Sequence, residues 1–162
     1  MDALATYLED HRSGALGAVE LLEALESRGG DTDLAAFAAD ILGRVKQDVV
    51  VLDQVIDRVG ERSRLKEAAA WVAQKAAHLK MPGDDMLGVF ESLEALGLGI
   101  LGKRSLWEAL GRIADGDRRL AEFDFSGLMR KAEEQFERVN DRRLAMAPAV
   151  LFDGTSERAG VP

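Results

Sequence analysis

The chain has no cysteine and only two histidines, His11 and His78, among its 162 residues. The absence of cysteine excludes disulfide scaffolds, cysteine-ligated zinc, iron–sulfur clusters and cysteine nucleophiles. Two histidines are too few for a histidine-rich metal centre. Proline is also scarce, with three residues, and aromatic residues make up 6% of the chain. Few prolines leave long stretches that helices can occupy without a break.

Positive charge is scarce relative to negative charge. The chain carries 21 Lys and Arg against 29 Asp and Glu, which gives a formal net charge of −8. Binding of nucleic acid needs a cationic surface, so we expect no nucleic-acid partner. The most apolar stretch, residues 86–102, is interrupted by Glu91 and Glu94 and is too short to span a bilayer. The first ten residues carry no basic segment of the secretory type, so we expect a soluble, cytoplasmic protein.

The residues that are abundant are helix formers. Ala, Leu, Arg, Glu and Lys together make up half of the chain, which is typical of long helices. The length fits one domain with a full core. We therefore expect a single all-α domain over residues 1–150 and a flexible tail over residues 151–162.

Glycines, prolines and acidic capping residues divide the chain into helices. Gly29-Gly30, Pro82-Gly83 and Asp115-Gly116-Asp117 act as breaks, and Pro148 is expected to end or kink the last helix. The expected helices cover residues 2–27, 31–60, 63–80, 84–114 and 124–146.

Apolar residues recur at alternating spacings of three and four in the four longest helices, which is the heptad pattern of helices that pack together. These positions include the polar residues His11, Asp48 and Lys103. The short turn near residue 30 makes the first two helices antiparallel neighbours and places His11 opposite Asp48. The segment over residues 61–80 is long enough to run back along the bundle, so the helix over residues 84–114 should lie parallel to the helix over residues 31–60.

The sequence resembles the ferritin-like superfamily, and within it a branch of bacterial four-helix bundles without an assigned activity. The residues that carry the resemblance are YLEDHRSGALGAVELLEAL, ADILGRVKQDVVVLDQVI, LKEAAAWVAQKAAHLK and FESLEALGLGILGKRSLWEAL. The resemblance implies a four-helix bundle with a long helical crossover, about residues 61–80, between the second and third bundle helices.

The di-iron members of that superfamily use a Glu from each of two helices and a Glu-x-x-His from each of the other two. This chain has no Glu-x-x-His, since Leu8 stands three residues before His11 and Lys75 three residues before His78. The resemblance therefore does not bring an iron-dependent activity with it, and we expect no cofactor.

Asp48, Lys103 and His11 are expected to meet inside the bundle, with Arg104 and Gln135 close by. A buried carboxylate needs a cationic partner, because unpaired burial of a charge costs several kcal/mol. We hypothesise that a cationic side chain or a protonated His11 takes the place of the metals. In one alternative Asp48 turns to the edge of the bundle and is hydrated. In another, His11 and Asp48 form a sparse metal site of an oxidase or a metal carrier.

Two further features have a structural and a functional interpretation. Glu94 lies beside the apolar seam and is expected to pair with Arg143. Gly97, Gly99 and Gly102 in one helix indicate either close helix approach and bending or a small cavity for an apolar ligand, because glycine costs about 1 kcal/mol relative to alanine in a helix.

The segment over residues 61–80 is basic and amphipathic. Its apolar stripe is expected to pack on the bundle, while its charged side is a candidate surface for a partner, for an anionic membrane, or for the acidic bundle of a second subunit in a homodimer. The basic residues are Arg62, Arg64, Lys66, Lys75 and Lys80.

We expect a non-catalytic bundle that has lost the di-iron site and serves in binding or assembly. The alternatives are a metal-dependent oxidase or carrier that uses His11 and Asp48, and a peripheral membrane or regulatory adaptor that uses the segment over residues 61–80. The sequence names neither the ligand nor the partner.

Overall fold

The structure is a computed structural model that describes residues 3–28, 30–60 and 85–152. In these ranges the chain forms four long α-helices and one short 3-10 helix, with no strand. The expected all-α bundle of four helices is confirmed, while the expected crossover over residues 61–80 lies outside the described ranges. The elements are α1 (Ala3–Glu26), α2 (Thr32–Val59), α4 (Met86–Ile113), η1 (Ala114–Gly116) and α5 (Phe125–Leu151).

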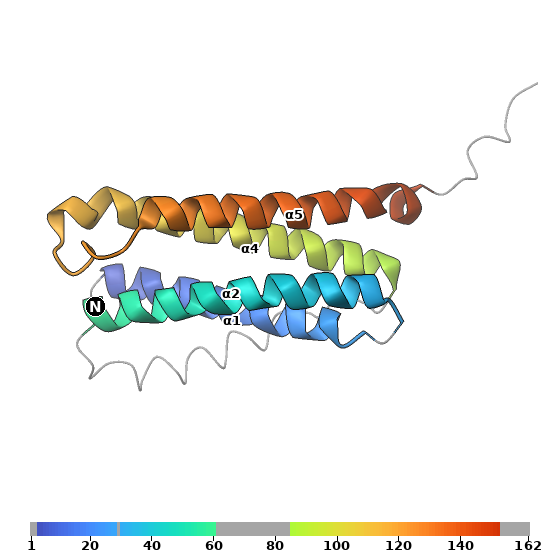
Figure 1. Ribbon diagram of the computed structural model, residues 1–162, viewed down its shortest axis with the longest axis horizontal. Helices are drawn as coiled ribbons and strands as arrows, with labels where there is room; N and C mark the ends of the chain where they lie inside the picture. The colour runs from blue at the N-terminus through green and yellow to red at the C-terminus, as the bar shows by residue number, and fades with distance from the viewer. Residues whose placement is uncertain (1–2, 29, 61–84, 153–162) are drawn as a thin grey trace, which may run out of the picture.

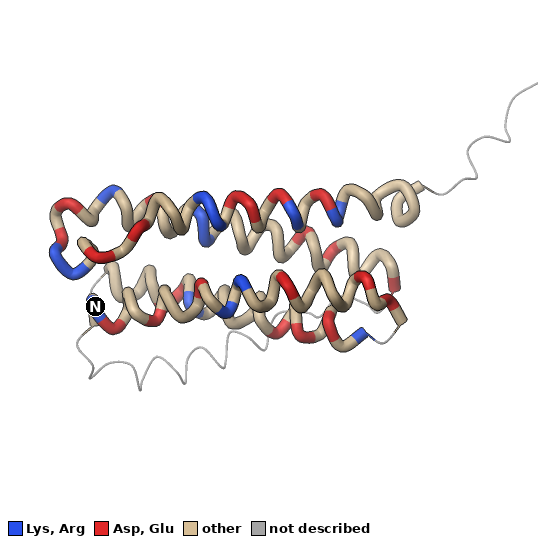
Figure 2. The backbone as a smooth tube through the Cα atoms, in the orientation of Figure 1, with Lys and Arg blue, Asp and Glu red and all other residues tan. Residues whose placement is uncertain are grey.

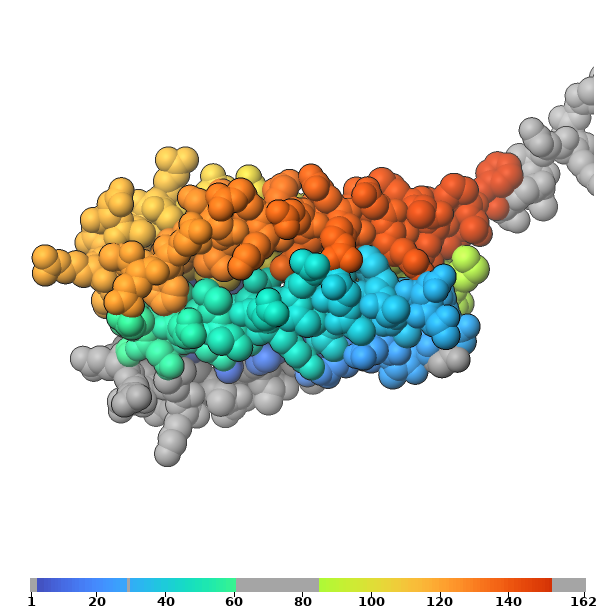
Figure 3. All heavy atoms as spheres, viewed as in Figure 1, coloured from blue at the N-terminus to red at the C-terminus, as the bar shows by residue number. Residues whose placement is uncertain are grey.

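The helices form two antiparallel hairpins that pack on each other (Figure 1). Helix α1 packs on α2, α4 packs on α5, and α1 also contacts α4. Helices α2 and α4 run in the same direction along the bundle, as the length of the segment between them predicts (Figure 1). On the face in Figure 3, side chains of α2 and α5 meet along the length of the bundle.

Three of the long helices begin at an aspartate that caps the first turn. The carboxylates of Asp31, Asp85 and Asp124 each accept a hydrogen bond from the backbone N–H three residues later. Such a cap satisfies an N–H group that has no partner inside the helix, and it stabilises a helix by about 1 kcal/mol. The acidic residues at the predicted breaks therefore set where α2, α4 and α5 begin.

The heptad positions form the largest part of the core. The seam residues of all four helices are buried or half-buried, and the polar residues Asp48 and Gln135 are buried among them. The largest side chains that are fully buried are Trp107, Leu8, Leu22, Ile41, Leu93, Leu96, Leu106, Leu110, Leu120, Val55 and Val139.

The end of the last helix differs from the prediction. Helix α5 does not stop at Met146 but continues through Pro148 to Leu151. Proline removes one backbone hydrogen bond and crowds the carbonyl four residues earlier, here that of Leu144. Leu144 is half exposed, so water can reach this turn of the helix. The expected tail therefore begins after Leu151, and residues 153–162 lie outside the described chain.

Charged residues of both signs recur along the four long helices (Figure 2). Exposed ion pairs join α2 to the second hairpin: Asp40 with Arg138 at 2.6 Å and Arg58 with Glu122 at 2.5 Å. Exposed pairs of this kind contribute about 0–1 kcal/mol each, so packing of the seams carries the fold. None of the helices in the described ranges is long and apolar enough to cross a membrane.

Candidate functional site

Three polar side chains from three helices meet in the middle of the bundle. Asp48 comes from α2, Lys103 from α4 and Gln135 from α5. The Lys103 Nζ donates hydrogen bonds to Asp48 Oδ2, at 2.5 Å, and to Gln135 Oε1. The Gln135 Nε2 donates to the same Asp48 Oδ2 at 2.9 Å. We call these three residues the polar network.

The polar network is buried, with Asp48 7% and Gln135 4% exposed. Burial lowers the pKa of Lys103 below its ordinary value because desolvation disfavours the ammonium, and the Asp48 carboxylate opposes this shift. The two charges neutralise each other, and the amide of Gln135 forms a hydrogen bond with each of them. A pair like this adds little net stability, but removing one member leaves a buried charge without a partner.

Each member of the polar network stands at or next to a seam position. Asp48 follows Val45 and precedes Leu52 at spacings of three and four, and Lys103 stands in the same relation to Ile100 and Trp107. Helices packed by such a seam direct these positions to the bundle interior. The sequence offset between parallel α2 and α4 then brings the two residues to the same height.

The structure places His11 and Arg104 differently from the hypothesis. His11 is half-buried on α1 and packs edge-to-face on Tyr7, with ring centroids 4.6 Å apart. Burial lowers the pKa of His11, with the Asp10 carboxylate opposing the shift, so the ring is neutral at pH 7. Within the described ranges, no hydrogen bond joins His11 to Asp48. The cation that pairs with Asp48 is Lys103 rather than a protonated His11.

The expectation that Arg104 joins the polar network is corrected. Its guanidinium turns outward and pairs with Glu133 at 2.7 Å and with Glu108 at 3.4 Å. The residue lies one position after Lys103, which rotates it by about 100° around the helix axis and away from the interior. Arg104 therefore stabilises the outer face of the second hairpin.

The expected pair of Glu94 and Arg143 forms on the surface, at 2.9 Å. The Arg143 guanidinium also donates to Asn140 and lies over the ring of Phe90, 5.3 Å from its centroid. The Glu94 side chain is 55% exposed, so this pair contributes little to stability and forms no enclosed site.

A cavity of about 370 Å³ lies between α1, α2 and α4. Its walls are mainly apolar, and both Asp48 and Lys103 belong to them. His11 and Tyr7 line it from the side of α1. One side of the polar network therefore borders open space, while Gln135 closes its other side.

Three helical glycines line this cavity: Gly14 on α1, and Gly99 and Gly102 on α4. A Cβ atom built at any of them would meet no heavy atom within 4 Å; Gly14 and Gly99 are exposed and Gly102 is half-buried, so the cavity is open to solvent on this side. Two of them, Gly99 and Gly102, are the glycines for which the sequence left a cavity open as an explanation. Gly14 is a residue that sequence reasoning missed, although it lies three positions after His11 on the same helix face.

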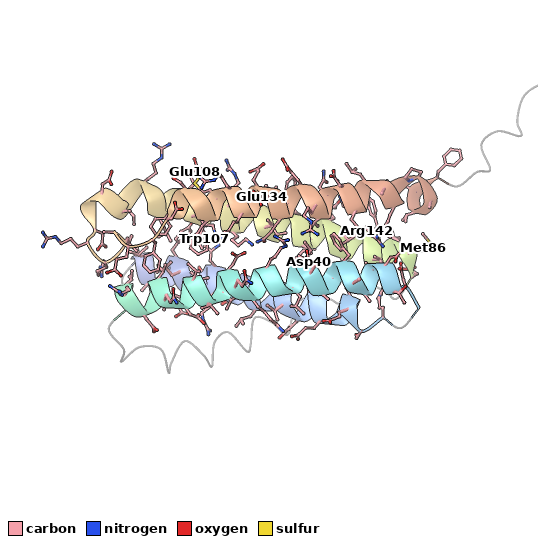
Figure 4. The ribbon with its side chains drawn as sticks, in the orientation of Figure 1. Asp40, Met86, Trp107, Glu108, Glu134 and Arg142 are labelled. Carbon is pink, nitrogen blue, oxygen red and sulfur yellow. The ribbon has the colours of Figure 1, made fainter. Side chains whose placement is uncertain are left out.

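Trp107 forms another part of the cavity wall. Its side chain is in the interior between the two hairpins (Figure 4) and 1% exposed, and it stacks on Phe125 with centroids 6.3 Å apart. The indole Nε1 is sealed and has no hydrogen-bond partner among the residues that the structure covers. Nothing in the helical pattern indicates such an unpaired donor.

The polar network does not fit a di-iron centre. Within the described ranges no three His, Cys, Asp or Glu side chains gather into a group that could hold a metal ion. Two bridged cations need several carboxylates, whereas the centre of this bundle offers Asp48 and an ammonium bound to it. The same ammonium competes with any metal for Asp48 in the alternative site with His11.

The candidate partner surface lies outside the residues that the structure describes. Its members are Arg62, Arg64, Lys66, Lys75 and Lys80.

Comparison of the chain with protein-family models, with curated proteins and with solved structures finds no match.

Proposed function

We propose that the chain is a non-catalytic bundle of ferritin-like arrangement that binds a small apolar molecule in the cavity between α1, α2 and α4. The observation that carries the proposal is the cavity with glycine at three helical positions on its wall. Glycine destabilises a helix by about 0.5–1 kcal/mol relative to alanine, and no described neighbour of these three glycines requires its small size. Gly14 and Gly99 are exposed and Gly102 is half-buried, so the pocket opens to solvent along their side.

The size of the cavity suits a small ligand. An enclosed apolar cavity of about 150 Å³ accepts benzene; this space is larger, at about 370 Å³, and is open to solvent on one side. Ligand sites are commonly about 300–1,000 Å³, with mainly apolar walls and a few polar groups that orient the ligand. The cavity, with the polar network on one side, has this character.

The polar network supports binding rather than catalysis. A general acid or base needs a proton that it can exchange with a substrate, and a nucleophilic amine needs an uncharged form. Lys103 Nζ lies 2.5 Å from the Asp48 carboxylate and also donates to Gln135, so the two groups are bound to each other. This pair suits a fixed polar anchor at the end of an apolar pocket.

Binding of 2-methylnaphthalene to the purified chain tests the proposal. We expect saturable binding, measured by the intrinsic tryptophan fluorescence and by ligand-observed NMR. Replacing Gly99 and Gly102 together by leucine fills the cavity and should abolish binding while the chain stays folded.

The matched control is Gly43→Leu, because Gly43 lies exposed on α2, outside the cavity, with no heavy atom within 4 Å of its Cβ position. It should leave the affinity unchanged. Equal affinities of the wild-type chain and the cavity-filled variant would contradict the proposal.

Metal analysis of the same chain, after incubation with ferrous, manganous and zinc ions, tests the metal alternative. We expect substoichiometric metal. Stoichiometric metal that disappears in Asp48→Ala and in His11→Ala would replace the proposal with a metal carrier or an oxidase.

A further inference from the structure

One of the two carboxylate oxygens of Asp48 accepts hydrogen bonds from described side chains. Both Lys103 Nζ and Gln135 Nε2 donate to Oδ2. No side chain in the described ranges donates to Oδ1, and Oδ1 is not among the sealed atoms without a partner, which are Trp107 Nε1 and Arg142 Nε. Asp48 is one of the residues that line the cavity.

The ammonium of Lys103 also has a group to spare. It carries three N–H donors, of which Asp48 and Gln135 accept two. No other described residue accepts the third, and Lys103 belongs to the same cavity wall. A molecule in the cavity therefore meets a strong acceptor and a strong donor that lie next to each other.

The charge of the wall restricts the ligand. Asp48 and Lys103 cancel, and His11 on the opposite wall is neutral at pH 7. A charged head group placed beside Asp48 and Lys103 would meet a charge of its own sign on one of these two residues. A pure hydrocarbon would cover Oδ1 and the third N–H without pairing either of them, at the cost of their hydration.

We propose that the ligand of the cavity is a neutral apolar molecule with one hydroxyl group, a phenol or an alcohol, that donates to Asp48 Oδ1 and accepts from Lys103 Nζ. This inference rests on the proposed function, because it assigns the head group of the ligand in the same cavity. A hydroxyl is the smallest neutral group that satisfies an acceptor and a donor at once.

Three naphthalene derivatives of nearly equal size separate the contribution of a hydrogen-bond donor in the head group from that of an acceptor. They are 2-naphthol, with a donor and an acceptor; 2-methoxynaphthalene, with an acceptor alone; and 2-methylnaphthalene, with neither. We expect 2-naphthol to bind about tenfold more tightly than either of the others, because it alone can pair both Asp48 Oδ1 and Lys103 Nζ. Titration followed by fluorescence and ligand-observed NMR at pH 7 gives the three dissociation constants.

A variant with an apolar centre tests the assigned residues. The triple substitution Asp48→Leu, Lys103→Met and Gln135→Leu replaces the polar network by side chains of similar volume, a change that cores often tolerate. It should still bind 2-methylnaphthalene and should lose the preference for 2-naphthol. Glu94→Gln, at an exposed ion pair outside the cavity, is the control and should keep the preference.

The outcomes distinguish this inference from the proposed function. Equal affinities for the three ligands in the wild-type chain would overturn the hydroxyl assignment and leave the cavity as a binding site. A preference for 2-naphthol that survives the triple substitution would overturn the role of Asp48 and Lys103. No binding of any of the three would overturn the proposed function. If the triple variant does not fold, the ligand series on the wild-type chain decides.

Discussion

The two sides of helix α4 are packed in opposite ways. Toward α5, a Cβ atom at Gly97 would lie 3.6 Å from the ring of Phe136, so the glycine allows a close approach. Toward α1 and α2, a Cβ atom at Gly99 or Gly102 would meet nothing within 4 Å. Glycines two and five positions apart therefore have different roles, one in close packing and the others in an open wall.

The role of a glycine within a helix can therefore be assigned only from the side chains that face it from other helices. The polar network lies at the border between the two sides, because Lys103 lines the cavity and also binds Gln135 on α5. The packed side holds the polar network in place, and the open side gives a ligand access to it.

The largest loss of stability is expected for a substitution in the polar network, which lies at the border between the two sides of α4. Asp48→Ala leaves the Lys103 ammonium buried without its carboxylate and should lower the free energy of unfolding by about 3–5 kcal/mol. Chemical denaturation measures this change. Asp57→Ala, on the exposed face of α2, and Glu94→Ala are the controls and should each cost less than about 1 kcal/mol. Similar losses in all three variants would show that Asp48 is hydrated and not part of a buried pair.

The packed side of α4 should resist a larger residue. Gly97→Leu forces side-chain atoms beyond Cβ against the ring of Phe136 and should destabilise the chain by about 1–3 kcal/mol. Thermal unfolding of this variant and of Gly99→Leu provides the comparison. Stabilisation by Gly97→Leu would mean that α4 and α5 are not in close contact at this height.

Replacing glycines on the open side of α4 should increase the stability of the chain. Gly99→Ala and Gly102→Ala should each stabilise the chain by about 0.5–1 kcal/mol, because alanine is the better helix former and the added methyl group enters free space. Denaturation of the single and double variants measures the gain. A loss of stability on either substitution would show that the space beside α4 is already filled.

The smallest expected effect is a pH dependence of the free energy of unfolding that is caused by His11 on α1. The pKa of His11 is lower in the folded chain than in the unfolded chain, where it is about 6.5. Below that value the unfolded chain binds more protons, so the free energy of unfolding should fall as the pH is lowered from 6.5 through the folded pKa. The difference between wild type and His11→Gln, measured at pH 7 and at pH 5, isolates this contribution. A wild-type chain that gains stability relative to His11→Gln at pH 5 would reverse the assignment.

Most of the fold could be predicted from the sequence, because heptad spacing and aspartate caps are local signals. The same signals place Asp48 beside Lys103, since two polar residues in apolar seams of parallel helices come to the same height. The end of α5 could not be predicted, because proline is tolerated in a final turn whose carbonyls reach water.

The cavity was less predictable than the polar network. Which of the two interpretations applies to Gly97 and to Gly99 depends on the side chain that faces each of them from another helix, and the ring of Phe136 faces only one. The outward turn of Arg104 follows from its rotation around α4, which differs from that of its neighbour Lys103 by one residue. Such choices depend on rotation and distance between helices, which spacing along the chain does not specify.

The central claim is that the space between α1, α2 and α4 is a pocket that can hold a small apolar guest. Diffraction from crystals of the chain under xenon pressure tests it most directly, because xenon enters dry apolar cavities regardless of the natural ligand. The account predicts xenon next to Gly99, Gly102 and Trp107, and none between α4 and α5 at Gly97. Side chains that close the space beside Gly99 and Gly102, with no xenon there, would contradict it.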